Sequence, residues 1–343
     1  MVQITIEPGS KAPLYKQLVN QIERSIRNGR MKPGTQLSSM NELAEQYRIS
    51  KETVKKAYGI LCDKGLVSPK QGKGFYVNDI SISALPKILV LFDKLSVYKQ
   101  ILFNAFKAEL SGKAEVTILT HDQRTELLKY YLDNCLDQYD FYVIAPHFPL
   151  DSVSQSQAMR QLSRIPNRKL IMIDRLQPGY PGHFGAVYQD FENDIYYGLT
   201  QGMDGVSGTI GRMRVITLPS SLYGVNIRVG VQRFCTEHSI PLEFLTSSPD
   251  RIRKGDVFLV LNSQLDAGLV SLARRIQASG LSVGTDVRII SYNESDMNEL
   301  VLGGLTTVSA DFAQMGRVAA RMILDKNLTK IHCDFRMIRR KTF

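Results

Sequence analysis

The sequence contains few cysteines, and their spacing excludes a metal site or a dense disulfide framework. The four residues are Cys62, Cys135, Cys235 and Cys333. None has CxxC or other metal-ligand spacing, so we expect small buried side chains in a reduced, cytoplasmic protein. The N-terminal stretch MVQITIEPGSKAPLYKQ lacks the long apolar core of a signal peptide. No run of about 18 apolar residues occurs, so the sequence predicts no membrane span.

Motifs of the common enzyme classes are also absent. The sequence has no GxxxxGKS/T, HExxH or GxSxG pattern. Its histidines form no local metal-ligand spacing; they are His121, His147, His183, His238 and His332. We therefore predict that the chain is not an enzyme and has no catalytic residue, no metal ligand and no cofactor.

Basic residues outnumber acidic residues, and the excess positive charge is unevenly distributed along the sequence. The 343 residues carry 43 Lys and Arg against 33 Asp and Glu, a net charge of +10. Residues 1–79 hold 13 of these basic residues and seven of the acidic ones. A small basic module on a nearly neutral body is the distribution expected of a nucleic-acid-binding head. The length and a hydrophobic content of 43% predict two or three folded domains.

The first eighty residues predict three helices followed by a hairpin. Apolar residues recur at i+4 from Leu14 to Ile26, which indicates a helix that starts near Pro13. Ser39 and Glu42 have capping-box spacing at the start of a second helix. Ser50 caps a third helix, and two short strands at 66–68 and 75–77 flank a basic, glycine-rich turn. This order is typical of a winged helix-turn-helix.

The candidate DNA contacts lie at the starts of the second and third helices and in the hairpin turn. They are Ser38, Ser39, Asn41, Ser50, Lys51, Thr53, Lys55, Lys56, Lys70, Gln71, Gly72 and Lys73. In helix-turn-helix proteins the N-terminal end of the third helix enters the major groove. The alternative is a solvated basic face on a winged helix that binds protein.

The stretch from Pro13 to Val77, PLYKQLVNQIERSIRNGRMKPGTQL through KQGKGFYV, resembles the DNA-binding head of the GntR family of bacterial transcription regulators. In that family an arginine usually stands where this chain has Asn41, and arginines usually stand where it has Lys51 and Lys55. Lysine cannot reproduce the bidentate contact of arginine with guanine. The resemblance therefore implies operator binding, with an operator that differs from the family's common one.

Beyond residue 86, apolar runs alternate with helical patterns. The runs are Ile88–Phe92, Val116–Leu119, Phe141–Ile144, Leu170–Ile173, Val215–Leu218, Val257–Leu261 and Val287–Ile290. Buried strands that alternate with helices predict mainly parallel sheets, and the length favours two lobes. Ligands of such sheets bind at the carboxyl ends of strands.

Polar and aromatic residues follow several of these strands, where a small polyhydroxylated ligand would find donors, acceptors and a ring face. Candidates from these loops are Asp93, Leu95, Tyr98 and His147. For any one of them the alternative is an ordinary surface loop or helix cap.

The order of segments in 87–343 is similar to the LacI-type and periplasmic-sugar-binding-protein fold. The matching segments are Lys169–Arg175, Val187–Asp194, Arg228 with Gly230 and Phe234, Leu261–Asn262, Ile289–Asn293 and Leu305–Phe312. The resemblance implies an α/β two-lobed body with parallel sheets. It also implies an effector cleft lined by Asp174, Arg175, Asp190, Arg228, Asn262 and Asn293.

The expected organisation is a winged helix-turn-helix domain at 1–79, a linker at 80–86 and an effector domain at 87–343. Within the effector domain we expect an N-lobe of about 87–187 plus 309–326 and a C-lobe of about 188–308 plus 327–343.

Two departures from the sugar-binding pattern bear on the ligand. Asn293 stands where an aspartate is usual, and Ala310 where a glutamine is usual. The loss of a carboxylate and an amide favours a deoxysugar such as fucose or rhamnose.

The sequence thus predicts a homodimeric regulator, a repressor of sugar-utilisation genes, that binds double-stranded operator DNA and responds to a monosaccharide. Three alternatives remain open. The ligand could be a non-sugar small molecule, the body could be an α/β enzyme, or the chain could be a scaffold without a ligand.

Overall fold

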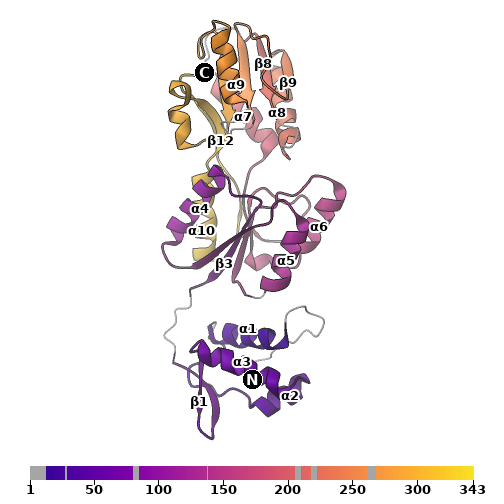
Figure 1. Cartoon of the computed structure of the whole chain (residues 1–343), viewed down its shortest axis with the longest axis vertical. Helices are drawn as coiled ribbons and strands as arrows, with labels where there is room; N and C mark the ends of the chain where they lie inside the picture. The colour runs from indigo at the N-terminus through magenta and orange to yellow at the C-terminus, as the bar shows by residue number, and fades with distance from the viewer. Residues whose placement is uncertain are drawn as a thin grey trace. The chain divides into compact units, whose positions relative to one another are not determined.

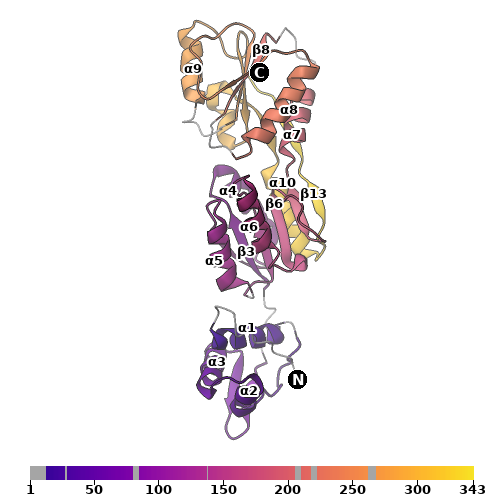
Figure 2. The same cartoon turned by 90° about the vertical axis from the view of Figure 1, so that its right-hand side faces the viewer.

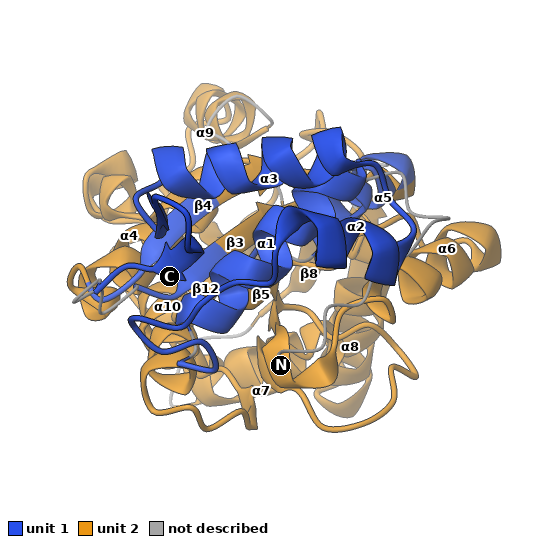
Figure 3. Ribbon diagram, turned by 90° about the horizontal axis from the view of Figure 1, so that it is seen from below, with its two compact units in different colours: residues 1–88, 113–117, 126–140 blue, residues 89–112, 118–125, 141–343 orange. Residues whose placement is uncertain are grey.

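The computed structural model describes residues 13–27, 29–79, 85–136, 138–204, 210–217, 222–261 and 268–343. The chain divides into two compact units (Figure 3). The first unit comprises residues 1–88, 113–117 and 126–140, and the second comprises 89–112, 118–125 and 141–343. The first unit therefore joins the predicted head to two segments of the predicted body. The predicted linker falls partly outside the described residues, and the predicted boundaries between head, linker and body stay predictions.

The N-terminal part folds into three helices and a two-stranded antiparallel hairpin. Its elements are α1 (Leu14–Arg27), α2 (Met40–Tyr47), α3 (Lys51–Asp63), β1 (Val67–Lys70) and β2 (Gly74–Val77). The predicted capping box forms: Ser39 Oγ accepts the Glu42 N–H at 3.2 Å, and Glu42 Oε2 accepts the Ser39 N–H at 2.8 Å. Such a cap stabilises a helix by about 1 kcal/mol.

Apolar side chains of α1 and α3 close the core of this head. Leu18 and Ile22 from α1 and Leu61 from α3 are fully buried. Each buried side chain of this size contributes about 1.5–3 kcal/mol. Tyr58 is also fully buried, and its hydroxyl donates to the Ser38 carbonyl at 2.7 Å. This bond fixes the chain before α2 against α3.

The rest of the chain forms two six-stranded sheets (Figures 1 and 2). The first has the order β13-β7-β6-β5-β3-β4 and the second β14-β12-β11-β10-β8-β9. The strands are β3 (Lys87–Phe92), β4 (Glu115–Thr120), β5 (Phe141–Ile144), β6 (Leu170–Asp174), β7 (Gly185–Tyr188), β8 (Arg212–Ile216), β9 (Leu242–Leu245), β10 (Asp256–Val260), β11 (Arg288–Tyr292), β12 (Thr306–Ala310), β13 (Lys330–His332) and β14 (Phe335–Ile338). In the second sheet β14 runs antiparallel to β12, whereas the other pairs are parallel. We call the first sheet with its helices the N-lobe and the second the C-lobe.

Helices cover both faces of these sheets. They are α4 (Val97–Leu110), α5 (Thr125–Cys135), α6 (Ser152–Leu162), α7 (Phe191–Met203), α8 (Gly224–Glu237), α9 (Leu269–Ala278) and α10 (Phe312–Leu324). In the C-lobe α7 and α8 pack on one face and α9 on the other (Figure 1). Alternate residues of β10 explain this, because Val257 and Leu259 face α7 and α8 whereas Phe258 and Val260 face α9.

Glycines permit the closest helix contacts. A Cβ atom on Gly316 of α10 would lie 2.2 Å from the Leu102 carbonyl oxygen of α4. A Cβ atom on Gly230 of α8 would lie 2.1 Å from the Glu192 carbonyl oxygen of α7. Only glycine allows the backbones to approach this closely.

Three chain crossings connect the lobes, between β7 and α7, between β12 and α10, and between β13 and β14. The Cys333 N–H donates to the Tyr188 carbonyl at 2.8 Å, and the Asp311 N–H donates to the Asp334 carbonyl at 2.9 Å. These bonds tie the crossings together. The division of the C-terminal segment differs from the expected one, because β13 pairs with β7 in the N-lobe rather than joining the C-lobe. β13 has only three residues and all are exposed, so its sequence carries no strand pattern that assigns it to a sheet.

Some features are absent from the described part of the chain. No helix there is long and apolar enough to cross a membrane. No group of three His, Cys, Asp or Glu side chains there could hold a metal ion. Cys235 and Cys333 are buried, whereas Cys62 and Cys135 are half-buried rather than buried as expected.

Candidate functional site

Helix α3 begins at an exposed, basic end. Ser50 Oγ accepts the Thr53 N–H at 3.2 Å and caps the helix. Lys51, Lys55 and Lys56 are exposed in its first two turns. The N-terminal end of a helix favours a phosphate, because its free N–H groups and its dipole are positive there. The lysines add positive charge to a position that already favours an anionic partner.

We call the hairpin of β1 and β2 the wing. Its turn is exposed, and a side chain from the segment before α2 holds it in place. Gly72 has a φ of 70°, a left-handed backbone that glycine adopts without strain. Gln36 Nε2 donates to the Lys73 carbonyl at 2.7 Å and ties the turn to the segment before α2. Lys70 Nζ lies 4.5 Å from the centroid of the Tyr76 ring. The wing therefore presents positive charge on a fixed backbone.

The predicted DNA contacts are mostly accessible in the folded head. Only Ser38 and Thr53 among them are half-buried, and the other ten are exposed. Lys56 Nζ lies 4.1 Å from the centroid of the Tyr15 ring, so α1 positions this lysine. Sequence reasoning missed this aromatic support, because nothing in the local pattern pairs a lysine of α3 with a tyrosine of α1.

Five buried polar side chains meet where strands of the N-lobe end. Asp93 follows β3, His147 follows β5, Asp174 ends β6, Gln189 follows β7, and Lys99 lies in the first turn of α4. Each is at most 6% exposed. Lys99 Nζ donates to Asp174 Oδ2 and lies 3.4 Å from Asp93 Oδ1. His147 Nε2 lies 2.8 Å from Asp174 Oδ2, and Gln189 Nε2 donates to Asp174 Oδ1. We call these five residues the Asp174 cluster.

Opposite charges set the ionisation of the Asp174 cluster. Burial by itself would raise the pKa of Asp174, but the Lys99 ammonium and His147 outweigh burial and hold that pKa well below its usual range. Burial also opposes the charged forms of Asp93 and Lys99, yet their attraction lowers the pKa of Asp93 and raises the pKa of Lys99. These three groups are therefore ionised at neutral pH and sum to a single negative charge.

Two details of the Asp174 cluster are typical of a ligand site. Asp93 Oδ1 is buried and has no hydrogen-bond partner among the described residues, although Lys99 is within ion-pair distance. A buried acceptor without a donor costs about 1–3 kcal/mol, which a ligand hydroxyl would offset. Asp174 has a φ of 69°. For a non-glycine residue this left-handed backbone costs about 1–3 kcal/mol, and such strain concentrates at functional sites.

Tyr223, at the N-terminal end of α8, contacts this site from the C-lobe. Its ring stacks on Phe191 with 4.7 Å between centroids and 3° between planes, and it forms a T-shaped pair with the His147 ring at 4.7 Å between centroids. The Arg175 guanidinium carbon lies 4.9 Å from the Tyr223 centroid, and a guanidinium N–H donates to the Tyr223 hydroxyl at 3.4 Å. Side chains of both lobes therefore form one wall around the Asp174 cluster.

Three other predicted ligand residues have no described contact with the cluster. Leu95 is 58% exposed. Tyr98 stacks on Phe312 with 5.5 Å between centroids. Arg228 is exposed on α8, and its guanidinium carbon lies 4.1 Å from the centroid of the Phe244 ring. Their role in ligand binding stays a prediction.

Asp190 and Asn293 stand at strand ends, as expected, but in different states. Asp190 Oδ1 accepts the Asn193 N–H at 3.3 Å and so caps α7. Asn293 has a φ of 74°, close to that of Asp174, and its Oδ1 is buried without a hydrogen-bond partner in the described ranges. The C-lobe thus offers a second unused acceptor. Asn262 lies outside the described residues.

Sequence reasoning missed Lys99, Gln189 and Tyr223. A lysine in the first turn of a helix is unfavourable next to the positive end of the helix dipole. Lys99, three residues after the cap Ser96, therefore carried a readable signal. Tyr223 carried none, because its partners lie on other elements far away in the sequence.

Comparison with known proteins identifies the head. The model of the bacterial regulatory proteins of the gntR family matches residues 14–77. The transcriptional repressor YtrA of Bacillus subtilis is 33% identical over 107 residues, which covers 31% of this chain and 80% of YtrA. The chain belongs to the GntR family. The GntR head comprises α1 to β2, the elements that carry the predicted DNA contacts.

Other comparisons extend into the body of this GntR protein. A model of the periplasmic binding protein-like domain matches residues 223–332. The arabinose metabolism transcriptional repressor of Halalkalibacterium halodurans is 24% identical over 347 residues, which covers 90% of this chain and 88% of that repressor. A shorter match, with the repressor NagR of B. subtilis, is 36% identical over 75 residues; it covers 22% of this chain and 31% of NagR and so is too short to span the body.

Solved structures share the fold of the body. The lac repressor bound to ONPG superposes with a TM-score of 0.58 at 16% identity, covering 90% of this chain and 100% of that one. CcpA of Lactococcus lactis superposes with a TM-score of 0.55 at 17% identity, covering 75% and 98%. At such identities the likeness establishes the fold alone. The predicted winged helix-turn-helix head and two-lobed body are confirmed, and the regulator names of the relatives confirm a regulator rather than an enzyme.

Proposed function

We propose that this GntR regulator is a homodimeric, cytoplasmic repressor that releases double-stranded operator DNA when a monosaccharide binds between its lobes. YtrA and the arabinose metabolism repressor are both named as repressors, which supports the sign of regulation. The observation that carries the ligand part is the buried Asp174 cluster of the N-lobe, closed by Tyr223 of the C-lobe.

The head supplies the operator contacts. Lys51 and Lys55 approach the major groove at the start of α3, and Lys70 and Lys73 contact phosphates from the wing. Two heads of a dimer read two half-sites of a near-palindromic operator.

A monosaccharide supplies what the site lacks. Its hydroxyls donate to Asp93 Oδ1 and Asn293 Oδ1, two buried acceptors that lack a hydrogen-bond partner in the described part of the chain. The Tyr223 ring covers an apolar face of the sugar. A methyl group in place of one hydroxyl suits the buried Ala310, which is 3% exposed, so a deoxysugar such as fucose is the finer hypothesis.

Ligand binding and operator release are coupled through the lobes. A ligand acts only by its different affinity for two conformations. Because Arg175 and Tyr223 come from opposite lobes, a ligand held between them favours the closed spacing. In a dimer that spacing sets the distance between the two heads.

A thermal-shift screen against monosaccharides, deoxysugars and sugar phosphates tests the ligand class. A ligand at about 100 times its Kd stabilises the protein by about 2.7 kcal/mol, enough for a visible shift of Tm. A selective hit supports the sugar site. No shift across the panel, with a folded sample, would favour a non-sugar effector or a ligand-free scaffold and would leave the head unaffected.

A further inference from the structure

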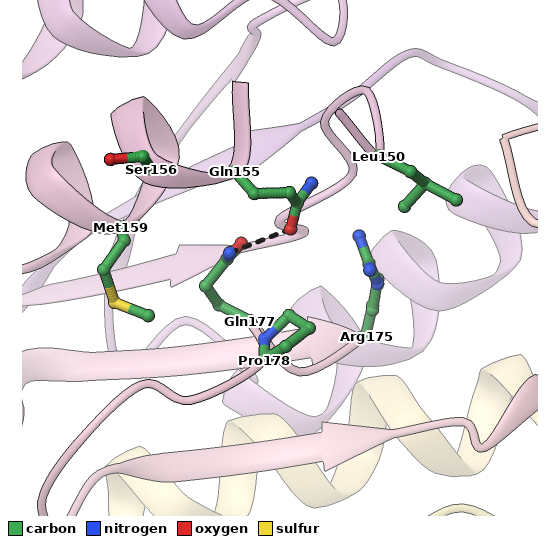
Figure 4. A pocket seen from close by; sticks show the side chains of 7 residues that line it. All are labelled: Leu150, Gln155, Ser156, Met159, Arg175, Gln177 and Pro178. Carbon is green, nitrogen blue, oxygen red and sulfur yellow. Dashed lines mark hydrogen bonds between the residues drawn. The ribbon is translucent and has the colours of Figure 1, made fainter. Parts of the chain in front are cut away.

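A cavity of about 400 Å³ opens in the N-lobe and shares Arg175 with the wall of the proposed sugar site (Figure 4). Its lining comes from the start of α6 and from the segment after β6. Leu150 and Met159 make part of the wall apolar, and Gln155 and Gln177 make part of it polar. None of these four residues was among the predicted ligand residues.

Hydrogen bonds fix how the two glutamines face. Gln155 Nε2 lies 2.7 Å from the Pro149 carbonyl and 3.3 Å from the Phe148 carbonyl, so its amide nitrogen points to the backbone. Gln155 Oε1 then accepts from Gln177 Nε2 at 3.0 Å (Figure 4). These hydrogen bonds leave Gln177 Oε1 available as an acceptor. Gln177 is only 4% exposed, and its Oε1 has no partner among the described residues. The missing partner is a donor, a hydroxyl or an N–H group.

Arg175 contributes a positive charge to the same cavity. Within the described ranges no carboxylate forms an ion pair with it, and its polar contact is the Tyr223 hydroxyl at 3.4 Å. Arg212 and Arg214 of the C-lobe, by contrast, both bind Asp256. A guanidinium that is partly buried and lacks an acidic partner matches a carboxylate or a phosphate.

We propose that the effector carries an acidic group, a carboxylate or a phosphate, which pairs with Arg175. The substituent that bears this group enters the cavity, where one of its hydroxyl or N–H groups donates to Gln177 Oε1. This inference rests on the proposed sugar site and specifies its ligand. Two different groups receive the two ends of the ligand, because the Asp93 carboxylate accepts from hydroxyls and Arg175 pairs with the anion. The proposed deoxygenated position faces Ala310 and lies elsewhere on the ligand.

Matched pairs of neutral and acidic sugars test the charge. The probes are galactose with galacturonate and glucose with glucose 6-phosphate, together with fucose, each titrated calorimetrically into the full-length protein. We expect an acidic member to bind at least tenfold more tightly than its neutral partner. Its affinity should fall with added salt, because an ion pair is screened. The two acidic probes distinguish a carboxylate from a phosphate.

Variants test whether the preference for an acidic sugar arises at this cavity. Arg175→Gln should weaken binding of the acidic sugar by about 10- to 100-fold and should abolish its salt dependence. Gln177→Met should weaken it by about threefold to tenfold. Arg160→Gln is the control, because it removes the same charge from an exposed position of α6 outside the cavity lining. Tm measurements verify that each variant is folded.

The outcomes separate this inference from the sugar proposal. Tight binding of a neutral sugar that equals or exceeds binding of its acidic partner would overturn the acidic group and leave the sugar site standing. Unchanged affinity of Arg175→Gln for the acidic sugar would overturn it as well. Absence of binding by every probe would overturn both.

Discussion

The guanidinium of Arg175 lies over the ring of Tyr223, with 4.9 Å between the guanidinium carbon and the ring centroid. Arg175 follows β6 in the N-lobe, whereas Tyr223 immediately precedes α8 in the C-lobe. Such a contact exists only when the lobes stand at this spacing. We therefore expect a bound ligand to favour lobe closure through its contacts with Arg175 and Tyr223.

Removal of the Tyr223 ring should weaken ligand binding. Tyr223→Ala loses the contacts with Phe191, His147 and Arg175, and calorimetric affinity should fall by about 10- to 150-fold, or about 1.5–3 kcal/mol. Tyr223→Phe keeps the ring and loses one long hydrogen bond, so its affinity should stay within about threefold of wild type. Equal losses in both variants would contradict a role for the ring.

Loss of Lys99 should destabilise the N-lobe. Lys99→Met leaves Asp93 and Asp174 buried without their cation, and urea denaturation should show a fall of about 3–5 kcal/mol in the free energy of unfolding. A second substitution, Asp174→Asn, removes one of the two uncompensated charges and should restore part of that loss. A double variant no more stable than Lys99→Met would contradict charge compensation in the Asp174 cluster.

The buried His121 should make stability depend on pH. Burial lowers the pKa of His121 to about 4, whereas an unfolded histidine titrates near 6.5. The unfolded chain therefore binds this proton more readily, and stability should fall as pH drops from 6.5 towards 4. Between pH 7 and pH 5 the loss should be about 2 kcal/mol.

The variant His121→Phe isolates this effect. Phenylalanine can keep the stacking on Phe148, whose ring lies 4.5 Å from that of His121, and it cannot titrate. The free energy of unfolding should fall between pH 7 and pH 5 in both proteins or in wild type alone, and the fall should be larger in wild type by about 2 kcal/mol. The same pH dependence in both proteins would show that His121 does not titrate as described.

Two glycines in helices should respond to alanine in opposite directions. Gly316→Ala places a Cβ atom against the backbone of α4, so calorimetry should show a destabilisation of about 1–3 kcal/mol. A Cβ atom on Gly59 of α3 would instead meet no heavy atom within 4 Å. Gly59→Ala should stabilise the head by about 0.5–1 kcal/mol, because alanine favours the helix. A stable Gly316→Ala variant would contradict the close approach of α4 and α10.

Charge reversal at the start of α3 should impair operator binding only. Lys55→Glu should sharply weaken binding of the operator and flatten its salt dependence by about one counterion per head. Ligand affinity should stay unchanged. Lys113→Glu reverses an exposed charge outside the helices and hairpin of the head and serves as the control. Full operator affinity in Lys55→Glu would remove this face of α3 from DNA recognition.

The head was predictable in detail because its signals are local. Ser39 and Glu42 specify one end of α2 within four residues, and Ser50 does the same for α3. The parallel sheets were predictable because strands buried on both faces are continuous apolar runs. The resemblance names Asp174 and Asn293 as ligand residues, and both stand at the end of such a run, which made their place at a strand end predictable.

The rest of the site depends on contacts that no local pattern records. Arg228 was assigned by resemblance, yet its guanidinium lies over Phe244 of β9. Gln177 gained its meaning only through Gln155, which the backbone of residues 148 and 149 orients. Such relations depend on tertiary structure, so a single sequence does not reveal them.

Ligand-dependent release of the operator tests the central claim most directly. An operator selected from random DNA is labelled, and its affinity for the full-length protein is measured by fluorescence anisotropy at fixed salt, with and without saturating sugar. Operator affinity should fall at least tenfold in wild type and should change little in Tyr223→Ala at the same sugar concentration. An operator affinity that does not change while the sugar is bound would contradict a repressor controlled from the cleft between its lobes.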